Sequence, residues 1–482
     1  MLQNKDINKI SELKNGFTHR WLEPDFILSS LKCFSFSALC KSLASLKRKG
    51  YSFEAVFSIL VCLPFLGKKT VHSVYRSPFS AYVEAQKDVF YRLKNNSAID
   101  WRSILWMFVH KFIKSTSGEP HVPRSPYCLV VDDSFLEKSG KFIERVSRMW
   151  DHVTGRYLLG FKLLALVYWD GTSCIPVDFS LHRERGRNKE KAYGLKSKEL
   201  KNQYKKRRNK DSHGHKRAKE ADMGKIESAI KMIKRAFSKG LKVDYLLMDS
   251  WFTCWAFVEL VKKSKRRTVH LIGMYKTPKT KFGFNGKFLT HSQISNELGK
   301  PKRCRKIGAY YKEAIVEWNG EKIKMFFSKQ GKNGKWRVFI TTDTGFSFIK
   351  MIEVYQIRWS IEVFFKEGKQ LLNLGRCQSN DFDAQIAETT LTMIQYIMLT
   401  LRYRYDTYES KGELFAGIQD NVGEYRLNER LWGLFLEIIK LIKVVFDGLD
   451  EEVIIEKIIN NEEASALFSR LIDIGGQGKA AA

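Results

Sequence analysis

The chain has 482 residues and carries 83 lysines and arginines against 52 aspartates and glutamates, a formal net charge of +31. Because 44% of the residues are hydrophobic and 13% are aromatic, the chain can bury a sizeable core, which excludes disorder throughout. The length predicts roughly two to four domains of ~150 residues each. Positive charge in this excess favours a polyanionic partner, nucleic acid first and an anionic membrane surface second.

Several features exclude other classes of protein. The eight cysteines are widely scattered without a CxxC pair, so we expect reduced thiols in a cytoplasmic protein, not a zinc finger. The first residues lack the apolar core of a signal peptide. The longest apolar stretch, 53–66, contains Glu54 and is too short to span a bilayer. Cys62 stands where a phosphate-binding GxxxxGK[ST] loop requires its first glycine, so ATP-driven chemistry is unsupported.

The first part of the chain divides near residue 120. Residues 1–120 place apolar and basic positions at helical spacing, which predicts a lysine-rich helical domain that binds DNA. A run of apolar residues over 127–131 predicts a buried strand that ends at the Asp132-Asp133 pair. Two further strands, 157–169 and 173–181, are expected to form a hairpin. Residues 121–275 therefore begin an α/β domain.

A strongly basic segment interrupts this domain. Residues 183–219 hold sixteen lysines and arginines against four acids, a net charge of +12. One interpretation is a solvated or disordered loop. The other is a phosphate-binding surface, because Arg183, Arg185, Arg187 and the basic run 205–208 repel one another unless a counter-charge is present. Both interpretations remain open at this point.

Helices and strands alternate again in the second half of the chain. We expect a helix over 225–238, a strand over 243–248, and a β-rich insertion over 276–342 that contains two hairpins. Long helices return at 346–372 and 384–403, within a segment, 343–405, that completes the α/β domain. The tail, 406–482, has a net charge of −7, and we expect its apolar run over 431–459 to form helices that mediate dimerisation.

Three acids stand out because of their positions. Asp133 and Asp249 each follow a short apolar strand, and strand ends at one edge of a sheet can converge on a site. The third acid, Glu362, lies in a predicted helix. Such carboxylates can hold two divalent ions ~3.5–4 Å apart for phosphoryl transfer. Hard oxygen ligands favour Mg²⁺, with Mn²⁺ as a substitute.

The helix around Glu362 presents further polar residues on one side. At about 100° per residue, Tyr355, Arg358, Glu362 and Lys369 fall within an arc of roughly 60°. The two cations could clamp the phosphates beside a scissile bond. An aspartate after a strand and a solvated helix face are also common structural features, so spacing alone leaves a purely structural interpretation open.

The spacing Tyr355-x2-Arg358-x3-Glu362-x6-Lys369 resembles the Y-R-E-K signature of bacterial insertion-sequence transposases, in the DDE group of the insertion-sequence-four type. Residues 131–134, Val-Asp-Asp-Ser, followed by Lys138, look like the first-acid motif of these enzymes. Residues 248–252, Met-Asp-Ser-Trp-Phe, look like the second-acid motif. The order of acids and β-insertion also agrees with the family, and the resemblance covers roughly residues 127–405.

The resemblance implies a ribonuclease-H-like catalytic core interrupted by the β-rich insertion, with helical N-terminal and C-terminal domains. Asp133, Asp249 and Glu362 would bind two metal ions, with Asp133 preferred to Asp132 because it directly precedes the serine. Contacts with DNA are expected from a wider set: Tyr355, Arg358, Lys369, Lys138, Arg183, Arg185 and Trp318. Trp318 and Trp336 are alternative candidates for an aromatic that stacks on a flipped base, although a tryptophan beside a hairpin turn more often packs against the neighbouring strand.

The leading hypothesis is a transposase that binds terminal inverted repeats and joins the element to target DNA by metal-dependent cleavage and strand transfer. The resemblance also implies a homodimer in a synaptic complex, near the bacterial nucleoid. The alternative is a domesticated, non-transposing DNA-binding regulator, but the presence of all three acids favours an active enzyme. A third hypothesis, a basic protein that binds a membrane surface, is not supported, because the sequence contains no convincing amphipathic anchor. No membrane partner is therefore expected.

Overall fold

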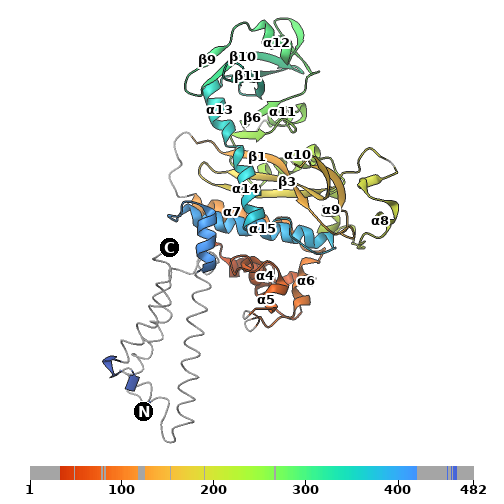
Figure 1. The fold of residues 1–482 in the computed structure, drawn as a ribbon, viewed down its shortest axis with the longest axis vertical. Coiled ribbons are helices and arrows are strands. Elements are labelled where there is room, and N and C mark those ends of the chain that lie inside the picture. The colour runs from red at the N-terminus through yellow and green to blue at the C-terminus, as the bar shows by residue number, and fades with distance from the viewer. Residues whose placement is uncertain are drawn as a thin grey trace. The chain divides into compact units, whose positions relative to one another are not determined.

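The computed structural model describes residues 33–420, apart from short gaps, and a few positions between 453 and 463 (Figure 1). The gaps lie at 48, 78–79, 81–82, 118–124, 152–153, 189 and 265–267. The predicted dimerisation helices over 431–459 fall almost entirely outside the described residues. The chain divides into two compact units, and the larger one comprises 33–61 and 69–406. In the smaller unit, the rings of Phe65 and Phe415 pack 5.9 Å apart.

The N-terminal part of the larger unit is helical in its described residues. Asp100 caps the longest of these helices by accepting a hydrogen bond from the Ser103 amide. The aromatic rings of Phe57 and Phe108 pack 6.4 Å apart at the centre of this region. The helices are α3 (Phe36–Ser42), α4 (Phe53–Cys62), α5 (Val71–Tyr75), α6 (Lys87–Lys94) and α7 (Trp101–Thr116).

A mixed sheet forms the centre of the larger unit. Its first part has the order β2-β3-β1-β5-β6, with β4 also paired to β3. Strands β1, β5 and β6 are parallel, whereas β3 is antiparallel to both β1 and β4. The predicted hairpin between β3 and β4 is confirmed. The strands are β1 (Cys128–Glu137), β2 (Ser147–Asp151), β3 (Arg156–Trp169), β4 (Cys174–His182), β5 (Tyr245–Met248) and β6 (His270–Tyr275).

Helices cover this sheet on both sides. Strand β4 is buried along its whole length and β3 along most of it, because α10 (Lys225–Ser238) packs on the sheet from one side while α7 and α15 (Phe382–Arg404) lie along the other (Figure 1). The predicted helices over 225–238 and 384–403 correspond to α10 and to most of α15, and only α10 has a clearly one-sided apolar face. The short helix α11 (Trp255–Lys262) follows β5 and packs near β6.

The β-rich segment extends the same sheet. Strand β12 pairs with β6, so the described sheet runs unbroken from the first part into this segment. Both predicted hairpins are confirmed, and the turn between β10 and β11 has Asn319 and Gly320 at positive φ, as a tight hairpin turn requires. The elements are β7 (Lys281–Phe284), β8 (Lys287–Thr290), α12 (His291–Glu297), β9 (Lys302–Cys304), β10 (Ala309–Trp318), β11 (Glu321–Gln330) and β12 (Arg337–Thr341).

The predicted helix over 346–372 is two helices in the structure, α13 (Phe348–Gln356) and α14 (Trp359–Gln370). The amides of Ile357, Arg358 and Ser360 bond to carbonyls three residues back, which tightens the chain between the two helices. The hydrophobic pattern continues through this break, so periodicity alone did not reveal it.

The described residues of the basic segment form short helices and ion pairs with the rest of the chain, which differs from the fully solvated loop that was one of the two interpretations. The segment contains two short helices, α8 (Ser197–Lys201) and α9 (His213–Glu220). Lys206 and Arg208 form ion pairs with Asp381 and Asp383 at the start of α15. Arg208 also pairs with Glu144 at 2.6 Å. Acids distant in sequence therefore supply part of the counter-charge that the basic run requires. In the described part of the chain, we find no helix long and apolar enough to cross a membrane.

Candidate active site

Strand β1 places its two adjacent aspartates on opposite faces of the sheet. The strand does not end at Asp132-Asp133 but continues to Glu137. Because successive side chains in a strand point to opposite faces, Asp132 shares one face with Ser134 and Asp133 shares the other with Phe135. The parallel pairing of Val131 with Met248 brings the following residues, Asp132 and Asp249, side by side. Because β1 stays extended through both aspartates, only one of them, Asp132, shares a face with Asp249.

Helix α14 covers the face of β1 that carries Asp132. The Arg358 guanidinium donates to Asp132 at 3.3 Å and to Glu362 Oε1 at 2.5 Å, so one arginine bridges two acids from different elements. Near the end of α14, Lys369 Nζ donates a hydrogen bond to Ser134 Oγ at 2.8 Å. The predicted shared face of Arg358, Glu362 and Lys369 is therefore directed at the Asp132 side of the sheet.

Asp249 lies at the end of β5, where its side chain organises the following turn. Its Oδ1 accepts hydrogen bonds from the backbone amides of Trp251 and Phe252, at 2.9 and 3.1 Å. The Tyr355 hydroxyl donates to the Met248 carbonyl at 3.3 Å, which ties α13 to the same strand end. Burial raises the pKa of Tyr355 to about 12, so this hydroxyl stays protonated and acts as a donor at neutral pH.

The carboxylates of Asp132 and Asp249 repel each other. Burial, and then the charge of Asp249, raise the pKa of Asp132 from 3.8 to about 7, although Arg358 opposes the shift. A buried pair of carboxylates with only partial neutralisation is the electrostatic environment in which a divalent cation gains most. The site thus combines hard oxygen donors with a negative charge that Arg358 only partly compensates.

The structure does not bring Asp133 to this site, contrary to our expectation. Its carboxylate lies on the opposite face of β1, with Lys225 Nζ at 2.7 Å and Lys162 Nζ at 3.8 Å. The family resemblance favoured Asp133 because it directly precedes a serine, and the sequence predicted a strand that ends at the Asp132-Asp133 pair. The alternation along a longer strand places Asp132 with Asp249, Arg358 and Glu362 instead.

Other residues expected to contact DNA are engaged within the protein. Lys138 is 7% exposed, and its ammonium donates to the carbonyls of Gly375 and Cys377. Trp318 is 6% exposed and packs against Tyr275 and Phe282, among other rings, so it belongs to the core of the β-rich segment. These two expectations are wrong, because neither side chain can reach a ligand in this structure.

The remaining predicted contacts are partly accessible. Arg183 forms a bidentate ion pair with Asp222. Its guanidinium carbon lies 4.1 Å from the centre of the Tyr193 ring. Arg185 is exposed. Trp336 is 38% exposed, and the ammonium groups of two lysines lie over its ring. Of the two tryptophans considered for base stacking, only Trp336 keeps an accessible ring.

Sequence reasoning missed two residues, Trp251 and Lys225, that contact each other near Asp133. Trp251, directly after the Asp249-Ser250 pair, is 52% exposed, and Lys225 Nζ lies 4.1 Å from the centre of a ring of its indole. The only available signal was the presence of a tryptophan in the second-acid motif. Lys225 had no signal, because it begins a helix distant in sequence from both aspartates.

The donor set fits a hard divalent cation, but not in its present arrangement. Within the described ranges, no group of three His, Cys, Asp or Glu side chains lies close enough to hold a metal ion. The bridge from Arg358 to Asp132 and Glu362 explains this, because the guanidinium occupies oxygens that a metal would need. Asp132, Asp249 and Glu362 would hold the ion, and Glu362 would exchange its arginine partner for it.

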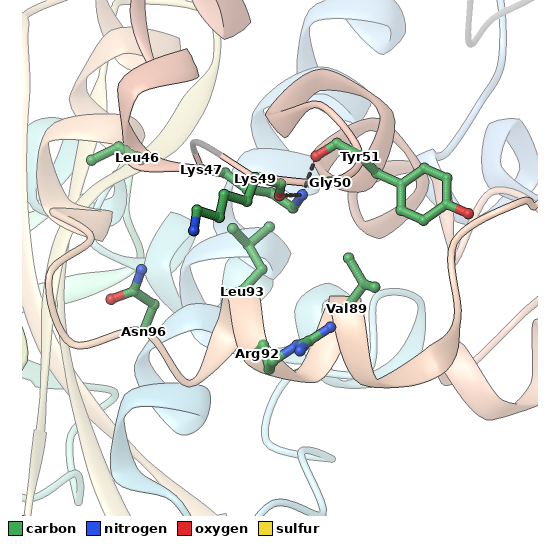
Figure 2. Close-up of a pocket in the computed structure, with 9 residues that line it drawn as sticks. All are labelled: Leu46, Lys47, Lys49, Gly50, Tyr51, Val89, Arg92, Leu93 and Asn96. Atoms are coloured by element: carbon green, nitrogen blue, oxygen red, sulfur yellow. Dashed lines mark hydrogen bonds between the residues drawn. The ribbon is translucent and has the colours of Figure 1, made fainter.

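A separate pocket of about 410 Å³ lies in the N-terminal helical part (Figure 2). Lys47 and Lys49 line it from the segment before α4, while Arg92 and Asn96 line it from α6 and the residues that follow (Figure 2). Burial, together with the charge of Arg92, lowers the pKa of Lys47. The pocket therefore concentrates positive charge near a backbone loop.

The mixed sheet is consistent with a ribonuclease-H-like fold, with one acid within β1, a second directly after the adjacent parallel strand β5, and a third on a later helix. Comparison with protein families supports this class. A model described as a DDE superfamily endonuclease matches residues 55–275, and one described as a transposase DDE domain matches residues 188–398. The chain therefore carries a DDE transposase/endonuclease domain. No curated protein matches the chain.

Proposed function

We propose that the chain is a DNA transposase of an insertion sequence, of the insertion-sequence-four type, that cleaves and joins DNA with Asp132, Asp249 and Glu362. The observation that carries the proposal is that one arginine, Arg358, contacts both Asp132 of β1 and Glu362 of α14, while Asp249 follows β5, the strand paired with β1 beside Asp132. Both family matches contain Asp249, the first also contains Asp132, and the second also contains Glu362. The presence of all three acids favours an active enzyme over a DNA-binding regulator.

The chain's own residues set the geometry of the reaction. At such carboxylates, Mg²⁺ or Mn²⁺ supplies activation of the attacking oxygen and stabilisation of the leaving oxygen of a phosphodiester. Asp132, Asp249 and Glu362 would hold such ions, and the Arg358 guanidinium, which contacts Asp132 and Glu362, would be placed to bind a neighbouring DNA phosphate. Lys369, exposed on α14 beside Ser134, provides a second cation for the same strand.

The N-terminal helical part supports the proposal with a second phosphate-binding region. Lys47, Lys49 and Arg92 surround a pocket whose charge suits a DNA backbone rather than a neutral ligand. The substrates would be the terminal inverted repeats of the element and a double-stranded target. Two ends must be held together for transposition, so we also propose a homodimer in the synaptic complex.

Strand cleavage tests the assignment of the acids. Duplexes containing the DNA that flanks the reading frame would be incubated with wild-type protein and single variants in Mg²⁺, and nicks mapped on a sequencing gel. We expect Asp132→Asn, Asp249→Asn and Glu362→Gln to abolish cleavage while retaining DNA binding, because each loses a metal ligand.

Asp133→Asn is the matched control for Asp132→Asn. It changes the neighbouring carboxylate to the same amide, and we expect it to reduce cleavage by no more than on the order of tenfold. Normal cutting by Asp132→Asn together with a complete loss in Asp133→Asn would restore Asp133 as the first acid. Normal cutting by Glu362→Gln would refute the three-acid site itself.

A further inference from the structure

Helix α14 carries Glu362, and another side of the same helix packs against α15. At about 100° per residue, Glu367 lies roughly 140° around the helix from Glu362, and Phe364 lies roughly 160° from it. The Tyr396 hydroxyl of α15 donates a hydrogen bond to Glu367 Oε2 at 2.7 Å. The Tyr396 ring packs edge-to-face against Phe364, with 4.9 Å between the ring centroids. One residue of α15 therefore contacts α14 twice, on the side that faces away from Glu362.

Tyr396 belongs to a helix that the rest of the larger unit holds in place. Its side chain is fully buried, as are almost all residues of α15 over 382–401. The neighbouring side chain, Gln395, donates to the carbonyls of Leu60 and Val61 near the end of α4, each at 3.1 Å. The same helix packs on β4 and α7. The backbone of α15 therefore gives Tyr396 a fixed position from which to orient α14.

The C-terminal end of α14 is tied to the strand that carries Asp132. Lys138 directly follows β1, and its ammonium donates to the carbonyls of Gly375 at 2.6 Å and Cys377 at 3.0 Å. Both carbonyls belong to the loop that follows α14. This contact limits movement of the end of α14 along the sheet. It does not determine how the helix is rotated about its own axis, which depends on the contacts with α15.

The hydrogen bond between Tyr396 and Glu367 restricts this rotation more than the ring packing does. Hydrophobic packing is non-directional, whereas a hydrogen bond requires a defined distance and angle. Burial, and then the charge of Glu367, raise the pKa of Tyr396 well above its usual value, so the hydroxyl stays protonated and remains the donor. A helix with its side chains has a radius of about 5–6 Å, so a rotation of about 10° moves a side-chain tip by about 1 Å. Mg²⁺ requires nearly ideal octahedral geometry, so a shift of that size at Glu362 would impair its binding.

We propose that Tyr396 and Glu367 are positioning residues, which set the rotation of α14 and thereby hold Glu362 on the Asp132 side of the sheet. Both act through the helix and not by contact with DNA or the reacting atoms. The inference rests on the proposed function, since it requires Glu362 to hold a metal ion. Removing a residue that orients a metal ligand typically costs about 10–100-fold in metal affinity or activity.

The kinetic test compares two variants that each remove one buried hydroxyl from α15. Tyr396→Phe keeps the ring that packs on Phe364 but loses the hydrogen bond. Thr390→Val, the matched control, loses a hydroxyl that donates to the Ile386 carbonyl at 2.9 Å within the helix. In single-turnover DNA cleavage over a Mg²⁺ series, we expect Tyr396→Phe to lower the maximal rate about tenfold or more and to raise the Mg²⁺ concentration at half-maximal rate, with DNA affinity unchanged. Thr390→Val should cleave as the wild type does.

Glu367 provides a second pair of variants that leaves Tyr396 intact. Glu367→Gln keeps an oxygen that can accept the hydroxyl hydrogen, so it should retain most of the cleavage rate. Glu367→Leu removes the acceptor and should be about as slow as Tyr396→Phe. The double variant with Tyr396→Phe and Glu367→Leu should be no slower than either single variant, because both changes remove the same hydrogen bond.

A measurement on the metal-free protein detects the orientation of α14 without cleavage. Trp359 is the first residue of α14 and is 61% exposed, so a fluorotryptophan at this position reports on the helix. Its fluorine resonance is identified by its disappearance in Trp359→Phe. We expect Tyr396→Phe to shift or broaden this resonance and Thr390→Val to leave it in place, because a general loss of stability does not reorient the helix.

Unchanged cleavage, Mg²⁺ dependence and fluorine resonance in Tyr396→Phe would overturn the positioning role, and so would equal losses in Thr390→Val. In that case, loss of cleavage in Asp132→Asn and Glu362→Gln would still support the proposed function. Normal cutting by these two variants would instead refute the proposed function, whereas a displaced Trp359 resonance in Tyr396→Phe would still show that Tyr396 orients the helix.

Discussion

Asp132 is a buried carboxylate beside another carboxylate, and this controls how the site responds to pH. Its pKa is raised to about 7, first by burial and then by Asp249. A raised pKa means that folding costs free energy once the pH exceeds the unfolded value of 3.8, with the full cost reached above about 7. The metal-free protein should therefore lose stability as the pH rises through this window, and a bound cation should restore it.

The same shift predicts a pH dependence of metal binding. Below about pH 7, an ion must displace the Asp132 proton, so we expect the affinity for Mg²⁺ to fall up to about tenfold per pH unit and to level off above that point. Isothermal titration calorimetry with Mg²⁺ across this range measures it. Asp132→Asn should bind weakly and without this slope, and a wild-type affinity that does not change between about pH 5 and 7 would contradict the prediction.

At this scale, the sequence predicted the kinds of residues better than their identities. Asp249 follows β5, and Arg358 and Glu362 lie at the start of α14, as the predicted strand end and helix face require, because spacing along such elements reflects geometry directly. The choice between Asp132 and Asp133 failed because it depends on where β1 ends, and a polar pair does not show whether a strand continues. Adjacent residues of a strand point to opposite faces of the sheet. Asp133 therefore lies on the face opposite to Asp132, and not merely slightly displaced from it.

Buried ion pairs set the stability of the basic segment. Arg208 is 3% exposed and contacts Glu144, Asp381 and Asp383. We expect Arg208→Ala to lower the free energy of unfolding by about 3–5 kcal/mol, because it leaves buried carboxylates without their partner. Urea unfolding measures the change, and limited proteolysis should then cut within 183–212. Lys231→Ala, which breaks the exposed pair with Glu227, is the control and should cost less than about 1 kcal/mol.

Trp318 and Trp336 should separate stability from binding in the β-rich segment. Trp318 fills an aromatic cluster, so Trp318→Ala should reduce the free energy of unfolding by about 3–5 kcal/mol. Trp336→Ala removes an exposed ring and should leave the thermal unfolding midpoint nearly unchanged while weakening DNA binding. A Trp318→Ala protein of normal stability, with only DNA affinity reduced, would return Trp318 to the surface role first expected for it.

Local patterns predicted most elements, and long-range pairing explains the failures. The hairpins at Asp170 and at Asn319-Gly320 and helix α10 follow from turn residues and periodicity within a few positions. The conformation of the basic segment cannot be predicted from such local patterns, because its ion-pair partners Asp381 and Asp383 lie about 175 residues away in the sequence. The burial of Lys138 is likewise set by carbonyls of a loop after α14.

Across the whole molecule, the formal charge of +31 overstates the charge that faces DNA. The basic segment contributes a net +12, yet Arg183, Lys206 and Arg208 are paired within the fold. The charge that remains accessible includes Lys49 at the N-terminal pocket, Lys369 at the acidic site, and Arg92, whose ion pair with Asp88 is exposed to solvent. The affinity for DNA should therefore depend on which lysines and arginines are accessible, and not on the total number of positive charges.

Salt dependence distinguishes these positions. DNA affinity should fall steeply with salt, since each neutralised phosphate contributes about 0.9 to the slope of log K against log salt concentration. We expect Lys49→Ala and Arg92→Ala each to reduce this slope by about 1, and Arg208→Met to leave the slope unchanged at temperatures where the variant stays folded. Fluorescence anisotropy over a salt series measures the slopes. An equal reduction by all three variants would mean that DNA responds to the overall charge, and that the pocket in Figure 2 has no particular part in binding it.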